Sequence, residues 1–386
     1  MAPRRRVLSV VGTRPNMMKI APIASELARR GEEFEHVLVH TGQHYDRELS
    51  EIFLEELGIG EPDFALGVGS GSHAQQTAGV MERLEPVLLE TEPDVVLVPG
   101  DVNSTLAAAL TAAKLQLPVW HVEAGLRSFD RTMPEEINRI VADQVSQFLF
   151  IHSPEARDNL LAEGCSAEAI HDVGNTMIDS LVAMRERIDA AGAPEARGLV
   201  RGDYLVVTLH RPSLVDGPLL AEAITQLEVV SDALEVVFPV HPLTRASLEA
   251  LGVDVASERL RLIEPVGYVE FMSLVGGSAG VLTDSGGIQE ETTYLGLPCL
   301  TLRANTERPI TVSMGTNTLL GLDPARIAEI PDLLAAARDL ERAIPPQWDG
   351  HAAERIADVL ERLEDYRGSW EPRGSVLAPE LPSAAS

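Results

Sequence analysis

The stretch Leu282–Glu291, LTDSGGIQEE, joins an apolar run to a helical pattern through two adjacent glycines. Ala279–Leu282 has the composition of a buried strand, and Ile288–Gly296 that of a short helix ending at a glycine cap. The Ser-Gly-Gly turn between them lets an anion approach the backbone, and the free N–H groups of the helix start favour negative charge. The stretch therefore predicts a phosphate-binding turn. The alternative is an ordinary strand-to-helix turn capped by its serine.

The size and charge of the chain limit the classes of partner. With 386 residues the chain exceeds what one hydrophobic core usually supports, so two domains are expected. The 59 acidic and 31 basic residues give a net charge of -28, which argues against nucleic acid and anionic membranes as partners. Cys165 and Cys299 lie far apart without metal-ligand spacing, so we expect free thiols. No apolar run is long enough to span a bilayer, and we expect a cytoplasmic protein.

Acidic residues follow the predicted strands of the first half. Asp101 and Glu123 each stand at the C-terminal tip of a strand, in the motifs PGDVNST and HVEAGLRS. Because the carboxyl ends of parallel strands meet at one edge of a sheet, these acids are expected to converge there. Glu135 opens the helix of the motif PEEINR. Its alternative role is an i,i+4 ion pair with Arg139 on the surface of that helix.

Basic and other polar residues follow the remaining strands. Arg14 lies in the turn after the first strand and Lys19 one helical turn later, where two cations suit a diphosphate. Further polar residues at predicted strand ends are Gln43, His44, His210, Arg211, His241, Arg303 and Arg308. The first half therefore supplies acids, and the second half supplies mostly cations and the glycine turn.

The alternation of strands and helices predicts an α/β fold with two Rossmann-like domains that face each other across a cleft. We expect the first domain over residues 1–172 and the second, which binds the phosphate, over 173–350. An amphipathic helix over 351–367 follows. Residues 368–386 are rich in Pro, Ser and Ala and predict a disordered tail.

Taken in order, eight motifs resemble the non-hydrolysing UDP-N-acetylglucosamine (UDP-GlcNAc) 2-epimerases over Val7–Gly321: GTRPNMMK, TGQH, GDVNST, HVEAGLRS, PEEINR, HRPS, DSGGIQEE and TERP. The resemblance implies the GT-B arrangement of two domains, a homodimer, and a final helix that crosses back towards the first domain. It also implies reversible conversion of UDP-GlcNAc into UDP-N-acetylmannosamine (UDP-ManNAc). In that reaction UDP is eliminated to leave 2-acetamidoglucal and is then added back, without metal or redox cofactor.

The resemblance also assigns roles to individual residues. Asp101, Glu123 and Glu135 match the acid/base carboxylates, and His210 matches a residue that stabilises departing UDP. Carboxylates clustered in a closed cleft are expected to raise one another's pKa. The predicted UDP site consists of Arg14, Lys19, Ser285, Gly286, Gly287, Glu291 and Arg308. The residues matching a second, allosteric UDP-GlcNAc site, which sigmoidal kinetics would reveal, are Gln43, His44, Arg211 and His241.

Two positions depart from the resemblance. Asn16 stands where the family usually has Glu, and Leu214 where Asn is common. Neither carries an assigned role in the reaction, so the departures bear on sugar preference, and modified UDP-sugars such as diacetamido uronic acids are open alternatives. The rival functions are a GT-B glycosyltransferase, a hydrolysing 2-epimerase that releases ManNAc and UDP, and an inactive UDP-sugar sensor.

Overall fold

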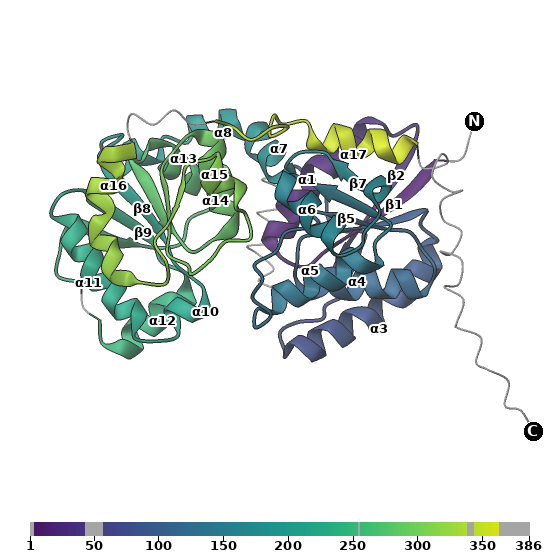
Figure 1. Ribbon diagram of the computed structural model, residues 1–386, viewed down its shortest axis with the longest axis horizontal. Coiled ribbons are helices and arrows are strands. Elements are labelled where there is room, and N and C mark those ends of the chain that lie inside the picture. Colours follow the sequence, from purple (N-terminus) through teal and green to yellow (C-terminus); the bar gives the residue numbers. More distant parts are fainter. Residues whose placement is uncertain (1–3, 43–56, 254, 338–342, 363–386) are drawn as a thin grey trace, which may run out of the picture.

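The computed structural model describes residues 4–42, 57–253, 255–337 and 343–362, and it has two lobes that each contain one sheet (Figure 1). The first lobe holds a seven-stranded sheet of order β3-β2-β1-β4-β5-β6-β7, and the second a six-stranded sheet of order β10-β9-β8-β11-β12-β13. The paired strands of both sheets are parallel. The predicted α/β class with two Rossmann-like lobes is therefore confirmed.

The strands of the first lobe are β1 (Arg5–Val11), β2 (Phe34–His40), β3 (Phe64–Ala65), β4 (Val95–Pro99), β5 (Val119–Val122), β6 (Phe148–Ile151) and β7 (Ile170–Asp172). Its helices are α1 (Arg14–Arg29), α3 (His73–Thr91), α4 (Asn103–Lys114), α5 (Pro134–Val145), α6 (Pro154–Ala162), the 3-10 turn η1 (Ala167–Ala169) and the late helix α17 (Ala352–Glu361). Three short helices lead to the second lobe: α7 (Thr176–Ala183), α8 (Arg185–Ala190) and α9 (Ala193–Ala196).

The strands of the second lobe are β8 (Tyr204–Thr208), β9 (Glu235–Pro239), β10 (Leu260–Ile263), β11 (Gly280–Thr283), β12 (Cys299–Thr301) and β13 (Asn317–Leu319). Its helices are α10 (Pro212–Val215), α11 (Leu219–Ser231), α12 (Pro242–Leu251), α13 (Tyr268–Gly277), α14 (Gly286–Leu295), α15 (Ile310–Ser313), η2 (Pro324–Glu329) and α16 (Ile330–Ala337).

Helices cover both faces of each sheet, and this explains why the central strands are apolar over most of their length. In β4, Val95 and Leu97 belong to the core cluster that includes α1, whereas Val96 and Val98 belong to the cluster that includes α3 and α4. Successive side chains of a strand point to opposite faces, so a strand buried on both faces has no polar alternation. The unbroken apolar runs of the sequence correspond to such strands.

Near its end the described chain returns to the first lobe, where α17 lies beside α1 (Figure 1). Ile356 and Leu360 of α17 share one buried cluster with Ile20 and Ile23 of α1. The N–H groups of Ala352 and Ala353 at the start of α17 donate to Asp179 in α7. Residues 363–367 of the predicted helix and the predicted tail over 368–386 lie outside the described residues.

The segment that leads back to α17 packs tightly against the first lobe. Trp348 is buried, and its Nε1 donates to the His152 carbonyl oxygen at 2.9 Å. Gly174 has φ +85°. A Cβ at Gly174 would lie 2.1 Å from the Gln347 carbonyl oxygen, so only a glycine at position 174 lets the two backbone segments approach this closely.

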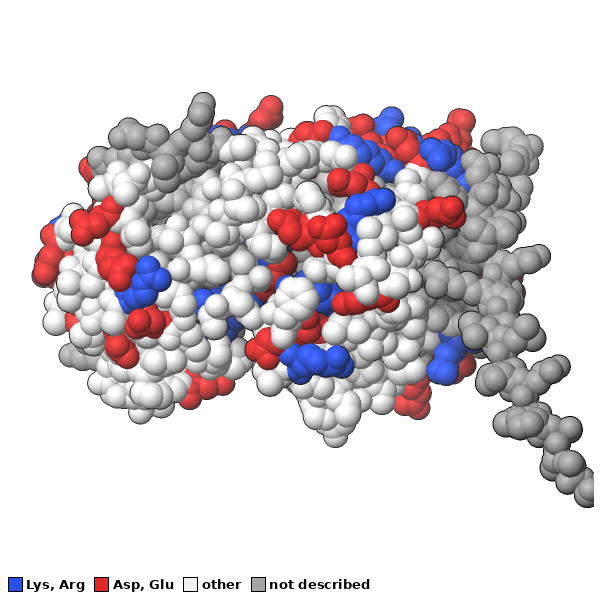
Figure 2. All heavy atoms as spheres, in the orientation of Figure 1, with Lys and Arg blue, Asp and Glu red and all other residues white. Residues whose placement is uncertain are grey.

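Several predictions from composition can be compared with the structure. Cys165 and Cys299 are not joined in a disulfide. No helix within the described ranges combines the length and apolar character needed to cross a bilayer. The face drawn in Figure 2 carries Lys and Arg only in small, separate groups.

Replacing Gly174 by alanine is expected to lower the melting temperature more than the same change at Gly164. Both glycines have a left-handed backbone, with φ +85° and +86°, so each substitution costs about 1 kcal/mol or more in backbone strain. An added Cβ has nothing within 4 Å at Gly164, but it meets the Gln347 carbonyl at Gly174. Scanning calorimetry of the two variants tests this difference, and equal melting temperatures would contradict the packing role of Gly174.

Candidate active site

Two of the predicted acids lie at the C-terminal edge of the first sheet. Asp101 follows β4 and is partly exposed, and its Oδ2 accepts from Arg139 Nε at 3.0 Å and Nη2 at 2.5 Å. Glu123 follows β5, is buried, and has φ +69°, an uncommon conformation for a residue with a side chain. Its carboxylate contacts Lys19 and, across the cleft, Arg308 of the second lobe. The buried Lys19 side chain, predicted to bind UDP, is therefore directed to Glu123.

The third predicted acid does not form the ion pair that its spacing allows. Glu135 lies in the first turn of α5 and is half-buried, and within the described chain it has no ion pair. Arg139 instead pairs with Asp101 and with Glu136, whose Oε2 is 3.0 Å from Arg139 Nη1. Burial and then the charge of Arg303 lower the pKa of Arg211 in the second lobe, and Glu135 is among the acids whose charge opposes this shift. Among the described residues Glu135 therefore has no ion-pair partner, and its charge reaches a cation of the other lobe.

A buried pair, His121 and Asp143, holds the two loops that carry Asp101 and Glu123. His121 Nδ1 lies 2.6 Å from Asp143 Oδ1, and its Nε2 lies 2.7 Å from the Gly100 carbonyl oxygen, next to Asp101. The second oxygen of Asp143 accepts from the N–H of Gly125 at 3.1 Å, two residues after Glu123. His121 belongs to the motif HVEAGLRS. The sequence does not indicate its pairing with Asp143, because Asp143 comes from a different element, the helix α5.

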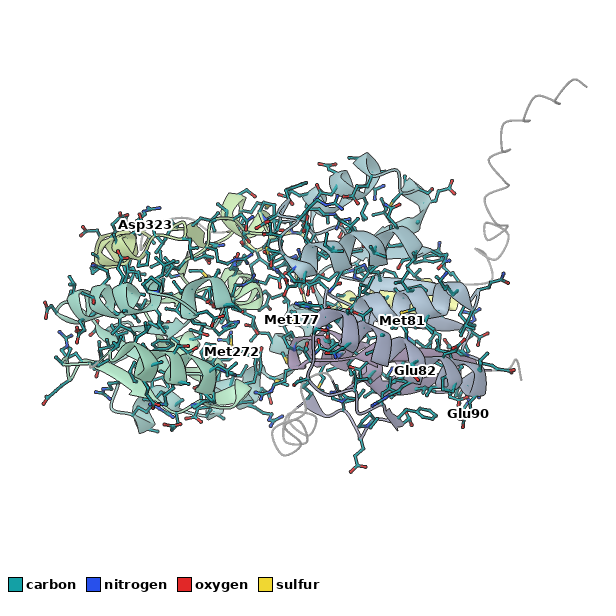
Figure 3. The ribbon with its side chains drawn as sticks, turned by 90° about the horizontal axis from the view of Figure 1, so that it is seen from below. Met81, Glu82, Glu90, Met177, Met272 and Asp323 are labelled. Atoms are coloured by element: carbon teal, nitrogen blue, oxygen red, sulfur yellow. The ribbon has the colours of Figure 1, made fainter. Side chains whose placement is uncertain are left out.

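The glycine turn of the second lobe lies directly under an arginine. Ser285 is the N-terminal cap residue of α14 but makes no side-chain capping bond. A Cβ on Gly286 would lie 2.5 Å from Arg308 Nη1, so the missing side chain makes room for this guanidinium. A Cβ on Gly287 would lie 3.5 Å from Met177 Cε, and Figure 3 shows Met177 where the two lobes meet. The predicted phosphate turn therefore faces the first lobe and has a cation above it.

Glu291, the predicted ribose ligand, is buried in the first half of α14. Its Oε1 accepts from the Tyr268 hydroxyl at 2.7 Å. Burial, assisted by the charge of Glu290, raises the pKa of Glu291 to about 7, although the Tyr268 hydrogen bond favours the charged form. The side chain is therefore poised between its neutral and charged forms near neutral pH.

Arg308 is the centre of a buried ion cluster. Besides Glu123, it pairs with Glu290 through Nε at 3.1 Å and with Glu307 through Nη1 at 2.8 Å. Arg303 Nη2 adds a second cation to Glu307 at 2.7 Å. Burial would raise the pKa of Glu307, but Arg308 and Arg303 hold it well below its usual range. Glu307 received no role from the sequence, although it lies inside the motif TERP.

The expectation that the clustered acids raise one another's pKa is wrong for Glu123. Burial alone would raise the pKa of this carboxyl. The charges of Lys19 and Arg308, with a smaller contribution from His152, lower it to about 2. The nearest charges to the Glu123 carboxylate are the cations Lys19 and Arg308, which hold this group in its ionised form.

The motif HRPS is fixed by the aspartate of the motif DSGG. Asp284 Oδ2 accepts from the backbone N–H groups of His210 at 2.8 Å and Arg211 at 2.7 Å. Its Oδ1 lies 3.2 Å from Nδ1 of His210, whose side chain is 46% exposed. Arg211 Nε donates to the Asp284 carbonyl oxygen at 2.9 Å. The predicted leaving-group residue His210 therefore stands beside the glycine turn with an open imidazole.

The residues of the predicted second site are only partly described. His241 caps α12, with its Nδ1 accepting from the Leu243 N–H at 3.3 Å. Burial, followed by the nearby charges of His210 and Arg14, lowers the pKa of His241. Arg14 of the first lobe therefore lies close enough for its charge to act on His241 of the second lobe. Gln43 and His44 lie outside the described residues.

The two departures from the family pattern have structural roles. Asn16 is buried, and its Nδ2 donates to the Pro99 carbonyl oxygen at 2.9 Å, which ties α1 to the end of β4. Its Oδ1 accepts from the Thr13 hydroxyl at 3.0 Å. Leu214 is fully buried in the main core of the second lobe. Leu214 therefore packs in the core, out of reach of a ligand in the cleft.

Three possible metal ligands meet at the cleft. Donor atoms of Glu123, His152 and Glu290 lie within 4.8 Å of one another. Lys19 and Arg308 already pair with the two carboxylates, so their negative charge is balanced by protein cations. Oε1 of Glu290 also lies 3.2 Å from His152 Nε2, which links the two lobes at the base of the cleft. His152 is a further residue to which the sequence assigned no role.

Comparison with known proteins places the chain among sugar-nucleotide epimerases. A family model described as UDP-N-acetylglucosamine 2-epimerase matches residues 26–361. The UDP-N-acetylglucosamine 2-epimerase of Methanococcus maripaludis is 40% identical over 361 residues, which cover 91% of this chain and 97% of that protein. The UDP-2,3-diacetamido-2,3-dideoxy-D-glucuronate 2-epimerase of Pseudomonas aeruginosa is also 40% identical, over 93% of this chain and 100% of that protein.

Solved structures agree with this comparison. The UDP-GlcNAc 2-epimerase of Methanocaldococcus jannaschii in complex with UDP-GlcNAc and UDP matches with a TM-score of 0.82 and 37% sequence identity. The match covers 92% of this chain and 99% of that chain. Fold, motif order and sequence identity agree over nearly the whole length, and the chain therefore belongs to the UDP-N-acetylglucosamine 2-epimerase family.

Proposed function

We propose that this protein catalyses the reversible epimerisation at C2 of UDP-GlcNAc to UDP-ManNAc, or of a closely related UDP-2-acetamido sugar. The observation that carries the proposal is the contact of Glu123, an acid of the first lobe, with Arg308, which lies over the glycine turn of the second lobe. A nucleotide diphosphate held on that turn would have its sugar beside the acids of the first lobe. Membership of the family supports the same reaction.

The proposed chemistry needs one proton acceptor, one proton donor and a site for the leaving group. A carboxylate takes the proton from C2, and the electron pair of the C2–H bond becomes the C1=C2 double bond of 2-acetamidoglucal. The C1–O bond breaks at the same time, and its electron pair leaves with the β-phosphate oxygen of UDP. A carboxylic acid then returns a proton to the other face of C2 while UDP adds back to C1.

The residues proposed for these roles lie on both sides of the cleft. Asp101, Glu123 and Glu135 are the proposed acid/base groups of the first lobe. His210 is proposed to stabilise the departing UDP, because its half-exposed imidazole stands beside the glycine turn. Donors on the diphosphate lower the barrier because negative charge builds up on the β-phosphate oxygen as the C1–O bond breaks.

The remaining UDP contacts are proposed for both lobes. The proposed set is Arg14, Lys19, Ser285, Gly286, Gly287, Glu291 and Arg308. Lys19 also pairs with Glu123, and Glu291 accepts a hydrogen bond from Tyr268, so each of these two side chains is already held in place by a neighbour. A second UDP-GlcNAc site that includes Arg211 and His241 also stays a prediction, as do the homodimer, the cytoplasmic location and a reaction without cofactor.

The identity of the sugar rests on the relatives. The M. maripaludis and P. aeruginosa proteins have the same identity to this chain, and their names specify UDP-GlcNAc and a diacetamido glucuronate. Leu214 is packed in the core of the second lobe, whereas Asn16 lies beside Lys19 and Glu123 around Gly100. UDP-GlcNAc is the proposed substrate because the family model and several of the relatives carry its name.

In D2O, the protein is expected to introduce deuterium at C2 of UDP-GlcNAc as UDP-ManNAc appears. The reason is that the proton removed from C2 goes to a carboxyl group, which exchanges with solvent before a proton returns. Proton NMR of the sugar nucleotides measures both events in one sample. Intact UDP-GlcNAc without deuterium would contradict the proposal and favour a glycosyltransferase or a sensor. Free ManNAc together with UDP would favour a hydrolysing enzyme.

Replacing Asp101 by Asn, or Glu123 or Glu135 by Gln, is expected to lower turnover on the order of 10²-fold or more while UDP still binds. Each change keeps the shape of the side chain and removes its ability to carry the proton. Turnover of UDP-GlcNAc and calorimetric binding of UDP are measured side by side.

The matched control is Glu168→Gln, an exposed acid of the first lobe away from the cleft. It should keep the turnover of the original protein. Near-normal turnover of Glu135→Gln would remove Glu135 from the proposed reaction.

A further inference from the structure

The imidazole ring of His121 lies between two hydrogen-bond acceptors. The ring is fully buried, with Nδ1 2.6 Å from Asp143 Oδ1 and Nε2 2.7 Å from the Gly100 carbonyl oxygen. A carbonyl oxygen and an ionised carboxylate can only accept, whereas a neutral imidazole donates through one nitrogen only. If Asp143 is ionised, His121 can therefore bond to both groups only as an imidazolium, with a proton on each nitrogen.

Two donors on its other oxygen favour the ionised form of Asp143. Oδ2 accepts from the Gly125 N–H at 3.1 Å and lies 2.7 Å from Nη2 of Arg127, which also pairs with Glu163. Burial would raise the pKa of Asp143, but the charges of His121 and Arg127 hold it below its usual value. The proton between Nδ1 and Oδ1 therefore belongs to the ring.

The imidazolium contacts the loops that carry two of the proposed acids. Its Nε2 bonds to the carbonyl of Gly100, the residue before Asp101. His121 itself lies in β5, two residues before Glu123, and the N–H of Gly125, two residues after Glu123, bonds to the carboxylate that the ring contacts. The backbone is thus fixed beside Asp101 and on both sides of Glu123.

The same pair also reaches the element that carries the third proposed acid. Asp143 belongs to α5, whose first turn contains Glu135. The helix contacts the Asp101 loop a second time through Arg139, whose Nε donates to Asp101 Oδ2 at 3.0 Å. The elements of all three acids therefore meet at one buried, charged junction formed by His121 and Asp143.

We propose that His121 is a buried imidazolium and that it forms, with Asp143, the positioning pair of the reaction. The inference rests on the proposed function and adds to it two residues whose side chains are buried below the acids. Removal of a proton from one face of C2 and return to the other face need acids at fixed positions around the sugar. Hydrogen bonds between charged groups are shorter and about twice as strong as neutral ones, so a charged pair holds these positions more firmly.

Nitrogen NMR of the histidine-labelled protein tests the charge, and His36 in β2 of the same sheet is the internal reference. His36 Nε2 lies 2.9 Å from the Ser9 hydroxyl oxygen, and burial lowers the pKa of His36 to about 4, although the charge of Asp63 opposes this shift. At about pH 8, where an ordinary imidazole is neutral, His121 should show two protonated nitrogens and His36 only one. The variants His121→Gln and His36→Gln assign the signals. An unprotonated nitrogen in His121 would overturn the proposal.

Turnover of UDP-GlcNAc tests the positioning role. His121→Gln and Asp143→Asn are expected to lower kcat on the order of 10-fold or more, with little change in KM or in UDP binding, because only the acids lose their fixed positions. The double variant should lose about as much as either single variant, since the two residues act as a unit. His36→Gln, the same substitution in the same sheet, is the matched control and should keep kcat.

The readouts separate a positioning pair from an ordinary core contact and from the proposed function. Lower melting temperatures of the variants with kcat unchanged, or losses of kcat that add up in the double variant, would overturn the positioning role. If His121→Gln does not fold, Asp143→Asn gives the kinetic test, because a neutral ring can still donate to Gly100 there. The NMR experiment needs no turnover. An original protein without epimerase activity would therefore contradict the proposed function, while the spectrum still decides the charge of His121.

Discussion

The buried contact between Glu123 and Arg308 is the interaction on which the arrangement of the site depends. Burying charges is costly unless they are paired, and this contact adds a partner from the other lobe to the partners that each group has in its own lobe. The pair links an acid at the end of β5 to a cation that lies over the start of α14. The two lobes are therefore in contact through the same residues that are proposed to carry the reaction.

The parallel topology of both sheets brings the site together. In each lobe the polar residues follow the carboxyl ends of the strands, where the connecting loops leave the sheet. The two edges face each other because α7 and the segment around Trp348 fix the lobes on one side of the cleft. The buried His121–Asp143 pair then holds the two loops of the first lobe in place. A rigid support of this kind suits a reaction that needs several acids at fixed positions.

Much of the fold could be predicted from the sequence, because apolar runs, glycine turns and helix caps are local signals. The sequence also predicts Asp101 and Glu123 at a common sheet edge, because each follows a strand, and the structure brings both to the cleft. The partners of these acids could not be predicted. Spacing allowed Glu135 to pair with Arg139, but Asp101 from another loop makes two bonds to that arginine.

The sign of the Glu123 pKa shift was missed for a related reason. Sequence motifs indicate that several acids converge. They do not show that the cations Lys19 and Arg308 lie against Glu123, where their charges lower its pKa. Likewise the contact of His152 with Glu290 appears only when the second lobe is placed against the first. Contacts between residues far apart in the chain depend on the packing of whole elements, which no local pattern records.

The most direct test of this account is a crystal structure of the protein with UDP. The account predicts that the diphosphate lies on the Ser285–Gly287 turn and that Arg308 donates to it. UDP bound away from this turn, or bound there without a contact to Arg308, would contradict it.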